Sequence, residues 1–378
     1  IFDWLLAEGR FLPGVEPMIE QMCQRMAAAG APLWRLRLSM RTLHPLLAAV
    51  SAVWERDKEG ATSIQTPHGL EGRSGYIGSP LEIIGRTDKP FRRRLYEGLS
   101  DQDHNVLHDL KARGGTDYYG LPMRFSDGSA GSVVFVTDRQ GGFSGPDIAG
   151  FDRLTSAVAP IVEVFSVRQI STTVAEAYLG PRTGRRVMSG QITRGDVETV
   201  TAAVLVSDIR DWTGLNNRLS GEAALALANR YFEIIADAIE AHEGEILKLI
   251  GDGVLALFPT EATGRSACGN ALSAARQALR AAQGGDAPPE LQFGIGMHFG
   301  DVLYGNIGST SRLDFTVLGQ TVNVAARIEG LCGKLGQPIL FSQDFANRLD
   351  EPAAVVANEQ LKGLKGAVPI LSPAGEHA

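Results

Sequence analysis

Two aspartates in the second half of the chain stand where short apolar runs end or meet. Asp208 closes the run AAVLVSD, and Asp252 lies between the apolar runs of EILKLIGDGVLALF. The Gly-Asp-Gly sequence predicts a hairpin turn, because glycine tolerates the positive φ that tight turns require. A helix capped by Ser220 is predicted between the first run and this hairpin, so that both aspartates reach neighbouring strands. Adjacent carboxylates repel each other unless a cation lies between them, and such hard oxygen ligands suit Mg²⁺ or Mn²⁺. The alternative is that each Asp serves only its turn.

A second polar pair follows Gly319. Asn323 and Arg327 are four residues apart and share one face of a predicted helix. Its buried stripe is formed by apolar residues at helical spacing, namely Val324, Ile328, Leu331 and Leu335. Arginine offers a fork of donors and asparagine both a donor and an acceptor, which suits a phosphate and a ribose. An ordinary exposed polar face is the alternative interpretation.

A mixed set of strands and helices must position these residues. The patterns predict a strand at 201–207, a helix at 220–242, a hairpin at 245–258, a helix at 263–283, a hairpin at 291–306, a strand at 314–318 and a helix at 320–335. Such a succession favours an α+β domain, a sheet with helices on one face in the ferredoxin-like layout.

Four stretches in this half, in this order, resemble one known family. They are VSDIRDWTGL, LKLIGDGVLALF, GIGMHFGDVLYGNIGS and FTVLGQTVNVAARIEGL, and they are similar to the catalytic domain of class III nucleotidyl cyclases over roughly residues 198–372. The resemblance implies a ferredoxin-like domain with a βαββαβ core, which we place at residues 198–378.

The resemblance also implies roles for particular residues. Two Mg²⁺ or Mn²⁺ ions per site are expected on Asp208, Asp252 and the Ile209 carbonyl. Asn323 would orient the ribose, Arg327 would stabilise charge on the α-phosphate, and Lys362, in QLKGLKG, would bind the triphosphate.

Lys248 and Thr316 match the two base-reading positions of the family, in a combination that resembles the bacterial Lys/Thr subclass. A lysine ammonium only donates, so it can bond N1 of adenine but opposes the N1 hydrogen of guanine. Thr316 can accept from the 6-amino group or donate. This indicates ATP, although cytosine offers the same edge and CTP is the chemical rival.

The function that the resemblance implies is an adenylate cyclase, a phosphorus-oxygen lyase. It would convert ATP to 3′,5′-cyclic AMP and pyrophosphate by a two-metal mechanism at the interface of a homodimer. The alternatives are a CTP or guanylate cyclase, or a catalytically weak nucleotide-binding signalling module.

The sequence predicts that the first half of the chain forms a separate domain. We expect a helical segment at residues 1–32, a mixed α/β domain at 33–170 that resembles a GAF-type sensory domain, and a helical linker rich in Gly and Arg at 171–197. The GAF resemblance implies a pocket for a small-molecule effector, which the sequence does not identify, and hence regulation of the second domain by the first.

Composition excludes several other classes. The chain has 378 residues, 44% of them apolar, and a formal net charge of -7, which argues against a nucleic-acid partner. Its 3 cysteines are scattered, so neither a disulfide framework nor a zinc site is predicted. Scattered cysteines of this kind fit a reducing cytoplasm, and since no apolar run approaches the roughly 20 residues that span a bilayer, we expect no membrane segment.

Overall fold

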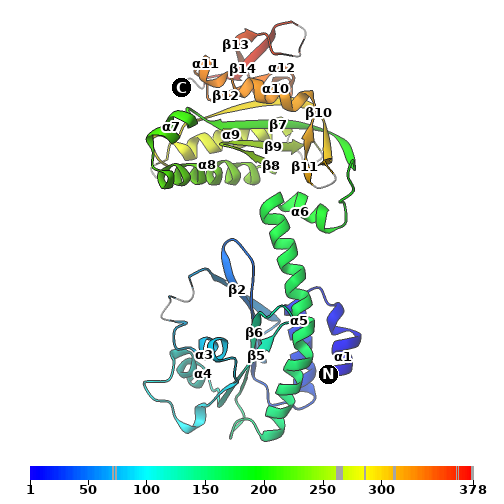
Figure 1. Cartoon of the computed structure of the whole chain (residues 1–378), viewed down its shortest axis with the longest axis vertical. Helices are drawn as coiled ribbons and strands as arrows, with labels where there is room; N and C mark the ends of the chain where they lie inside the picture. The colour runs from blue at the N-terminus through cyan, green and yellow to red at the C-terminus, as the bar shows by residue number, and fades with distance from the viewer. Residues whose placement is uncertain are drawn as a thin grey trace. The chain divides into compact units, whose positions relative to one another are not determined.

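The structure is a computed structural model that describes residues 1–69, 72, 75–260, 267–284, 287–309, 312–362, 364 and 366–375 (Figure 1). Two compact units make up the chain, an N-terminal unit of Ile1–Ala177 and a C-terminal unit of Tyr178–Ala378. Their boundary falls in the last turns of one helix, α5 (Gly145–Leu179). None of the helices among the described residues is both long and apolar enough to cross a membrane.

The N-terminal unit is built on one antiparallel sheet in the order β3-β2-β1-β6-β5-β4. Its strands are β1 (Arg35–Arg41), β2 (Leu47–Glu55), β3 (Ala61–Pro67), β4 (Phe91–Arg94), β5 (Asp117–Arg124) and β6 (Ala130–Thr137). Alternation along β1 puts Leu36 and Leu38 on one face and Arg35 and Arg37 on the other.

Helices pack on both faces of this sheet. The apolar face of β1 packs with α1 (Phe2–Ala7), α2 (Val15–Ala28) and α5 in one hydrophobic core. The opposite face is covered by α3 (Pro80–Thr87), α4 (Asn105–Ala112) and the short 3₁₀ turn Leu95–Glu97. Ser79 caps α3 by accepting a hydrogen bond from the backbone N–H of Glu82.

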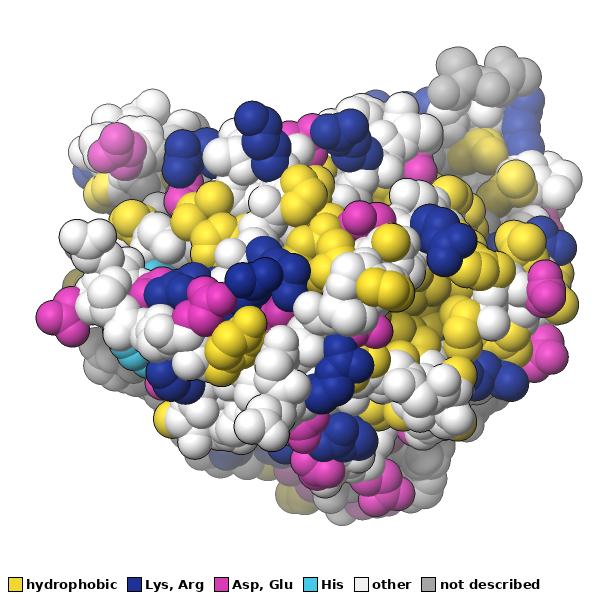
Figure 2. Space-filling model, turned by 90° about the horizontal axis from the view of Figure 1, so that it is seen from below, with side chains coloured by type: hydrophobic (Ala, Val, Ile, Leu, Met, Phe, Trp, Pro, Cys, Tyr) yellow, Lys and Arg dark blue, Asp and Glu magenta, His cyan; other side chains and the backbone are white. Residues whose placement is uncertain are grey.

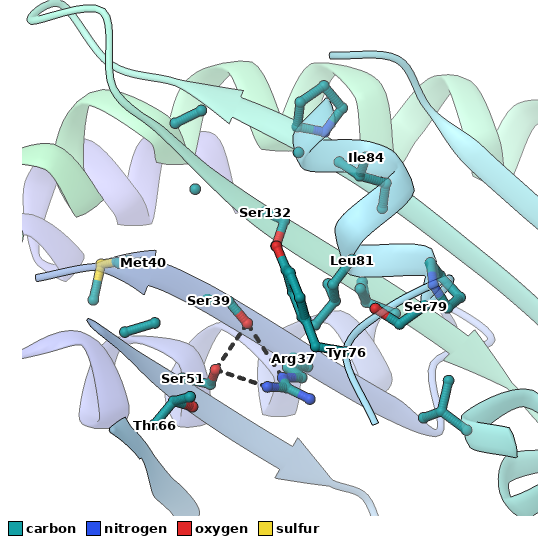
Figure 3. Close-up of a pocket in the computed structure, with 18 of the residues that line it drawn as sticks. Arg37, Ser39, Met40, Ser51, Thr66, Tyr76, Ser79, Leu81, Ile84 and Ser132 are labelled. Atoms are coloured by element: carbon teal, nitrogen blue, oxygen red, sulfur yellow. Dashed lines mark hydrogen bonds between the residues drawn. The ribbon is translucent and has the colours of Figure 1, made fainter. Parts of the chain in front are cut away.

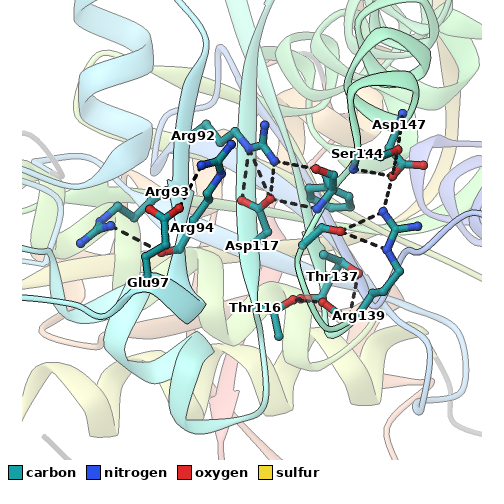
Figure 4. A network of polar contacts seen from close by, with 12 residues as sticks. Arg92, Arg93, Arg94, Glu97, Thr116, Asp117, Thr137, Arg139, Ser144 and Asp147 are labelled. Carbon is teal, nitrogen blue, oxygen red and sulfur yellow. Dashed lines mark hydrogen bonds and ion pairs between the residues drawn. The ribbon is translucent and has the colours of Figure 1, made fainter.

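The basic run in β4 is neutralised by carboxylates within the unit (Figure 4). Arg92 pairs with the fully buried Asp117 at 2.7 Å, and Arg93 pairs with Asp103 at 2.8 Å. Asp117 also accepts a hydrogen bond from the Phe143 N–H at 3.0 Å. On the face shown in Figure 2, Lys and Arg side chains likewise lie among acidic and apolar ones.

The C-terminal unit contains a larger sheet in the order β13-β14-β12-β10-β7-β9-β8, with β11 paired to β10. The strands are β7 (Val197–Ile209), β8 (Glu245–Ile250), β9 (Gly253–Pro259), β10 (Phe293–Gly308), β11 (Leu313–Leu318), β12 (Ile339–Ser342), β13 (Ala353–Glu359) and β14 (Val368–Pro373). The strand β7 lies between β10 and β9 and is antiparallel to both.

Helices cover both faces of this sheet, whereas the sequence pattern predicted one. The helices α8 (Gly221–Ala241) and α9 (Ala267–Ala282) pack on the face that carries Ala203 and Leu205. The helix α10 (Gln320–Glu329) packs on the other face through Ala325, next to Val204 (Figure 1). Shorter helices complete the unit, namely α6 (Pro181–Met188), α7 (Trp212–Arg218), α11 (Cys332–Leu335) and α12 (Gln343–Ala346).

The predicted hairpin at 291–306 is wrong, because β10 is one continuous strand of 16 residues. Its glycines, which resemble turn signals in sequence, instead permit close packing. A Cβ on Gly296 would lie 2.2 Å from the backbone nitrogen of Glu329, and one on Gly300 would lie 2.8 Å from Oγ1 of Thr321. The predicted helix at 320–335 is likewise interrupted at Gly330, between α10 and α11.

Gly296→Ala tests how closely α10 depends on this glycine. The added methyl group would meet backbone atoms that cannot rotate away, so we expect a loss of about 1–3 kcal/mol in the free energy of unfolding. For a unit of this size that lowers the melting temperature by roughly 2–12 °C, measured by calorimetry.

The matched control is Gly221→Ala at the start of α8, where an added Cβ meets nothing within 4 Å. Equal melting temperatures for the two variants would contradict this account of the contact between α10 and β10.

Candidate active site

The predicted pair of carboxylates comes together at the end of β7. Asp208 lies opposite Gly253 in the pairing of β7 with β9, and Asp252 immediately precedes that glycine in the turn between β8 and β9. Gly251 has a φ of 64°, the left-handed conformation that the turn requires. The Asp252 carboxyl group is close enough to Asp208 to change its proton affinity. Both side chains are partly buried.

This contact changes the proton affinity of Asp208. Burial and the adjacent Asp252 carboxylate raise the pKa of Asp208 from 3.8 to about 6. The guanidinium of Arg210 and the Ile209 N–H act in the opposite direction. A carboxyl group whose pKa is raised by burial and by a second carboxylate is one that a divalent cation stabilises in its ionised form.

The donors at this point fit a hard cation. Carboxylates of Asp208 and Asp252 and the backbone carbonyl of Ile209 are oxygen ligands of the kind that Mg²⁺ and Mn²⁺ prefer. In the part of the chain that the structure describes, no cluster of three or more His, Cys, Asp or Glu side chains offers an alternative metal site. A site on two side chains would therefore complete its coordination with backbone, solvent or substrate oxygens.

Arg210 links this strand end to α10, which the sequence analysis did not anticipate. Its guanidinium forms an ion pair with Glu329 in the last turn of α10. Gly294 leaves room for it, since a Cβ there would lie 2.0 Å from Arg210 Nη2. Arg210 stands two residues after Asp208, so its presence near the carboxylates was readable from the sequence, but its partner 119 positions away was not.

The predicted base-reading residues lie on neighbouring strands. Lys248 on β8 forms an ion pair with Asp314 on β11, and Thr316 is two residues further along the same strand. Asp314 is therefore a residue near the site that the sequence analysis missed. The signal was present, because residues two apart on a strand point to the same face.

The remaining predicted residues lie on α10 and after β13. Asn323 is exposed and Arg327 is partly buried, both outside the buried stripe of α10. Lys362 is exposed in the segment between β13 and β14. Among the described residues, the side chains of Asn323, Arg327 and Lys362 have neither a hydrogen bond nor an ion pair, so their donors are available to a ligand.

The structure thus leaves the predicted residues in separate groups. The aspartates share the end of β7 and the β8–β9 turn, Lys248 and Thr316 share β8 and β11, and Asn323 and Arg327 share α10. No hydrogen bond or ion pair between side chains described here connects one group with another.

Known proteins resemble the C-terminal unit in sequence. Residues 196–370 match the sequence model of the adenylate and guanylate cyclase catalytic domain. Adenylate cyclase 1 of Rhizobium meliloti (strain 1021) is 32% identical over 151 residues, which are 38% of this chain and 22% of that protein. The adenylate cyclase of Anabaena cylindrica is 37% identical over 168 residues, which are 42% of this chain and 32% of that protein.

Among solved structures, a bacterial light-regulated adenylyl cyclase is similar at 28% identity, with a TM-score of 0.42 over 47% of this chain and 91% of that one. The matches span 22% and 32% of the two curated relatives. Residues 196–370 are therefore similar in sequence to adenylate and guanylate cyclase catalytic domains.

The carboxylate pair gives a prediction for thermal stability without turnover. The folded-state pKa of Asp208, about 6, exceeds its ordinary 3.8, so the folded state binds a proton that the unfolded state releases. In EDTA the pair therefore destabilises the fold fully above about pH 6, and this penalty disappears as the pH falls below about 4. Asp252→Asn should raise the melting temperature at about pH 7.5, with a difference that shrinks toward about pH 4.

Added Mn²⁺ should raise the melting temperature of the wild type but not that of Asp252→Asn. At about 100 times its Kd, the ion stabilises the folded wild type by about 2.7 kcal/mol, or roughly 5–10 °C, and should not stabilise Asp252→Asn. Asp237→Asn, an exposed position on α8, is the control and should behave as wild type. Equal stabilisation of Asp252→Asn and wild type by Mn²⁺ would rule out this metal site.

Proposed function

We propose that this chain is an adenylate cyclase, which converts ATP to 3′,5′-cyclic AMP and pyrophosphate. The observation that carries the proposal is the contact between Asp208 and Asp252 inside a domain of the cyclase family. Asp208, Asp252 and the Ile209 carbonyl would hold two Mg²⁺ or Mn²⁺ ions, which supply neutralisation of the triphosphate and activation of the 3′ hydroxyl.

The other residues of the chain bind and orient the substrate in this proposal. Asn323 hydrogen-bonds the ribose and places the 3′ oxygen in line with the α-phosphorus. Arg327 donates to the α-phosphate oxygens, on which charge grows as the pentavalent transition state forms. Lys362 pairs with the outer phosphates. The unpartnered state of these side chains among the described residues supports their role as ligand donors.

Base recognition is assigned to Lys248 and Thr316. The Lys248 ammonium donates to N1 of adenine, and the Thr316 hydroxyl accepts from the 6-amino group. The ion pair with Asp314 supports this orientation, because it holds the ammonium beside the strand that carries Thr316.

A homodimer would complete the site. Asn323 and Arg327 share no bond with the carboxylate pair within one copy of the described chain, so a second copy would supply them. Large apolar side chains are exposed on β8, β10 and β11, where a partner would cover them, namely Leu249, Ile250, Leu303, Leu313 and Leu318.

Regulation is assigned to the N-terminal unit, because every residue with a proposed chemical role lies after Ala177. In this proposal residues 33–170 form a GAF-like sensory domain and residues 171–197 transmit its state to the cyclase domain, residues 198–378. The ratio of the cyclisation rates of the full chain and of residues 178–378 measures this regulation.

Base choice can be tested by supplying ATP, GTP, CTP and UTP separately with Mn²⁺ and identifying each product. We expect the wild type to prefer ATP. Lys248→Glu should lower the ATP-to-GTP rate ratio by roughly 5- to 150-fold, since it replaces a matched donor by a group that opposes adenine at about 1–3 kcal/mol. Adding Thr316→Cys should increase the shift.

Lys111→Glu, on the exposed side of α4, is the matched charge reversal and should leave the ratio unchanged. A wild type that prefers GTP, or an unaltered ratio in Lys248→Glu, would disprove the base-reading assignment while the carboxylate site stands.

Shared sites can be tested by mixing two inactive variants. Asp208→Ala and Arg327→Ala should each abolish cyclisation, since each removes one of the two groups from both sites. Random exchange then yields heterodimers with one intact site, and we expect about a quarter of wild-type activity.

The control mixture is Asp208→Ala with Asp252→Ala, which damages the same group twice and should stay inactive. If heterodimers of the first mixture form but remain inactive, a site shared between two copies is excluded.

A further inference from the structure

A pocket in the N-terminal unit lies between the polar face of the sheet and α3 (Figure 3). Its volume is about 220 Å³. The floor is a row of three serines on adjacent strands, since Ser39 on β1 is paired with Ser132 on β6 and with Ser51 on β2. The hydroxyls of Ser39 and Ser51 are 2.8 Å apart.

Arg37 lies in this floor without an acidic partner. Its Nε donates to the Ser39 hydroxyl at 3.2 Å and its Nη2 to the Ser51 hydroxyl at 3.1 Å. Within the described ranges, no carboxylate lies close enough to Arg37 to form an ion pair. Burial lowers the pKa of Arg37, and the neighbouring Arg35 lowers it further.

Three other arginines on strands of the same sheet have acidic partners. Arg35, two residues earlier on β1, bonds Glu55 at 3.0 Å. Arg92 and Arg93 each hold a carboxylate, as described for β4. Arg37 is partly buried. A partly desolvated guanidinium with only hydroxyl partners is destabilising, and an anion that binds beside it offsets the lost hydration.

The remaining walls of the pocket indicate what kind of group is attached to the anionic head of the ligand. Leu81 and Ile84 from α3 and Val134 from β6 are apolar and face the pocket, and Tyr76 lies over it (Figure 3). The lining also holds Arg41, a further positive charge, and Asp88, whose carboxylate is paired with Arg124. Such a pocket favours a compact apolar group attached to an anionic head.

We propose that this pocket binds a small organic anion, whose carboxylate or phosphate group pairs with Arg37 and accepts hydrogen bonds from the serine hydroxyls of the floor. The planar guanidinium presents a fork of donors that matches either head group. All of these residues lie in the N-terminal unit, so the binding is independent of the proposed cyclisation.

Titration calorimetry of the full chain tests this with three probes of similar size, benzoate, phenyl phosphate and benzyl alcohol. We expect at least one of the two anions to bind the wild type and the neutral alcohol to bind at least tenfold more weakly. The preferred anion distinguishes a carboxylate ligand from a phosphate ligand. Arg37→Gln should weaken anion binding at least tenfold, whereas Arg153→Gln, on the exposed side of α5, should not.

Failure of both anions to bind the wild type, equal binding of the alcohol, or unchanged binding in Arg37→Gln would each overturn the proposal. A second measurement separates a ligand anchor from a structural residue. Arg37→Met removes an uncompensated charge while Ser39 and Ser51 keep their mutual hydrogen bond. The ligand-free variant should therefore melt at or above the wild-type temperature, and a lower melting temperature would show that Arg37 is structural.

Discussion

The C-terminal unit depends on a repulsive contact between two carboxylates that its backbone brings together. Strand pairing fixes the backbone of Asp208 opposite Gly253, and the turn holds the backbone of Asp252 next to that glycine, so the fold keeps the two residues close together. Burial and this carboxylate neighbour together raise the pKa of Asp208. Folding supplies the energy that holds the two charges together, and binding of a divalent cation would recover it. A binding site of this kind is preorganised, because the protein has already opposed the repulsion before the ligand arrives.

Close backbone packing on the other side of β10 determines where the second group of polar residues stands. Gly296 and Gly300 allow α10 to rest on the strand at distances that a Cβ would prevent. With one side of α10 buried in this way, Asn323 and Arg327 remain on another side. The Arg210–Glu329 ion pair then fixes the end of α10 relative to the end of β7. Both groups are therefore rigidly held, yet they are not joined to each other in the described part of one copy, which is why we propose a site shared between two copies.

The arginines of the N-terminal unit differ in whether they have a carboxylate partner. Those of β4 neutralise buried or partly buried carboxylates such as Asp117 and Asp103, so they stabilise the fold and have little charge left for a ligand. Arg37 stabilises nothing of comparable charge among its described neighbours. A cation kept in a pocket without a counter-ion costs stability, and such costs occur at binding sites. The proposed effector site thus follows from a local imbalance of charge and not from the layout of the fold.

Local sequence patterns were sufficient for several features. The Gly-Asp-Gly turn, the strand that ends at Asp208 and the helical spacing of Asn323 and Arg327 all follow from interactions within a few residues, and the structure contains each of them. Long-range packing decided the rest. The glycines of β10 resemble a hairpin signal, but their role is to let α10, which comes later in the chain, pack closely on the strand. Distant segments likewise determine three other features: the helix on the second face of the sheet, the pairing of Lys248 with Asp314, and the lack of a carboxylate beside Arg37 among the described residues. Periodicity shows which residues of an element are buried, whereas only the tertiary structure shows what they are buried against.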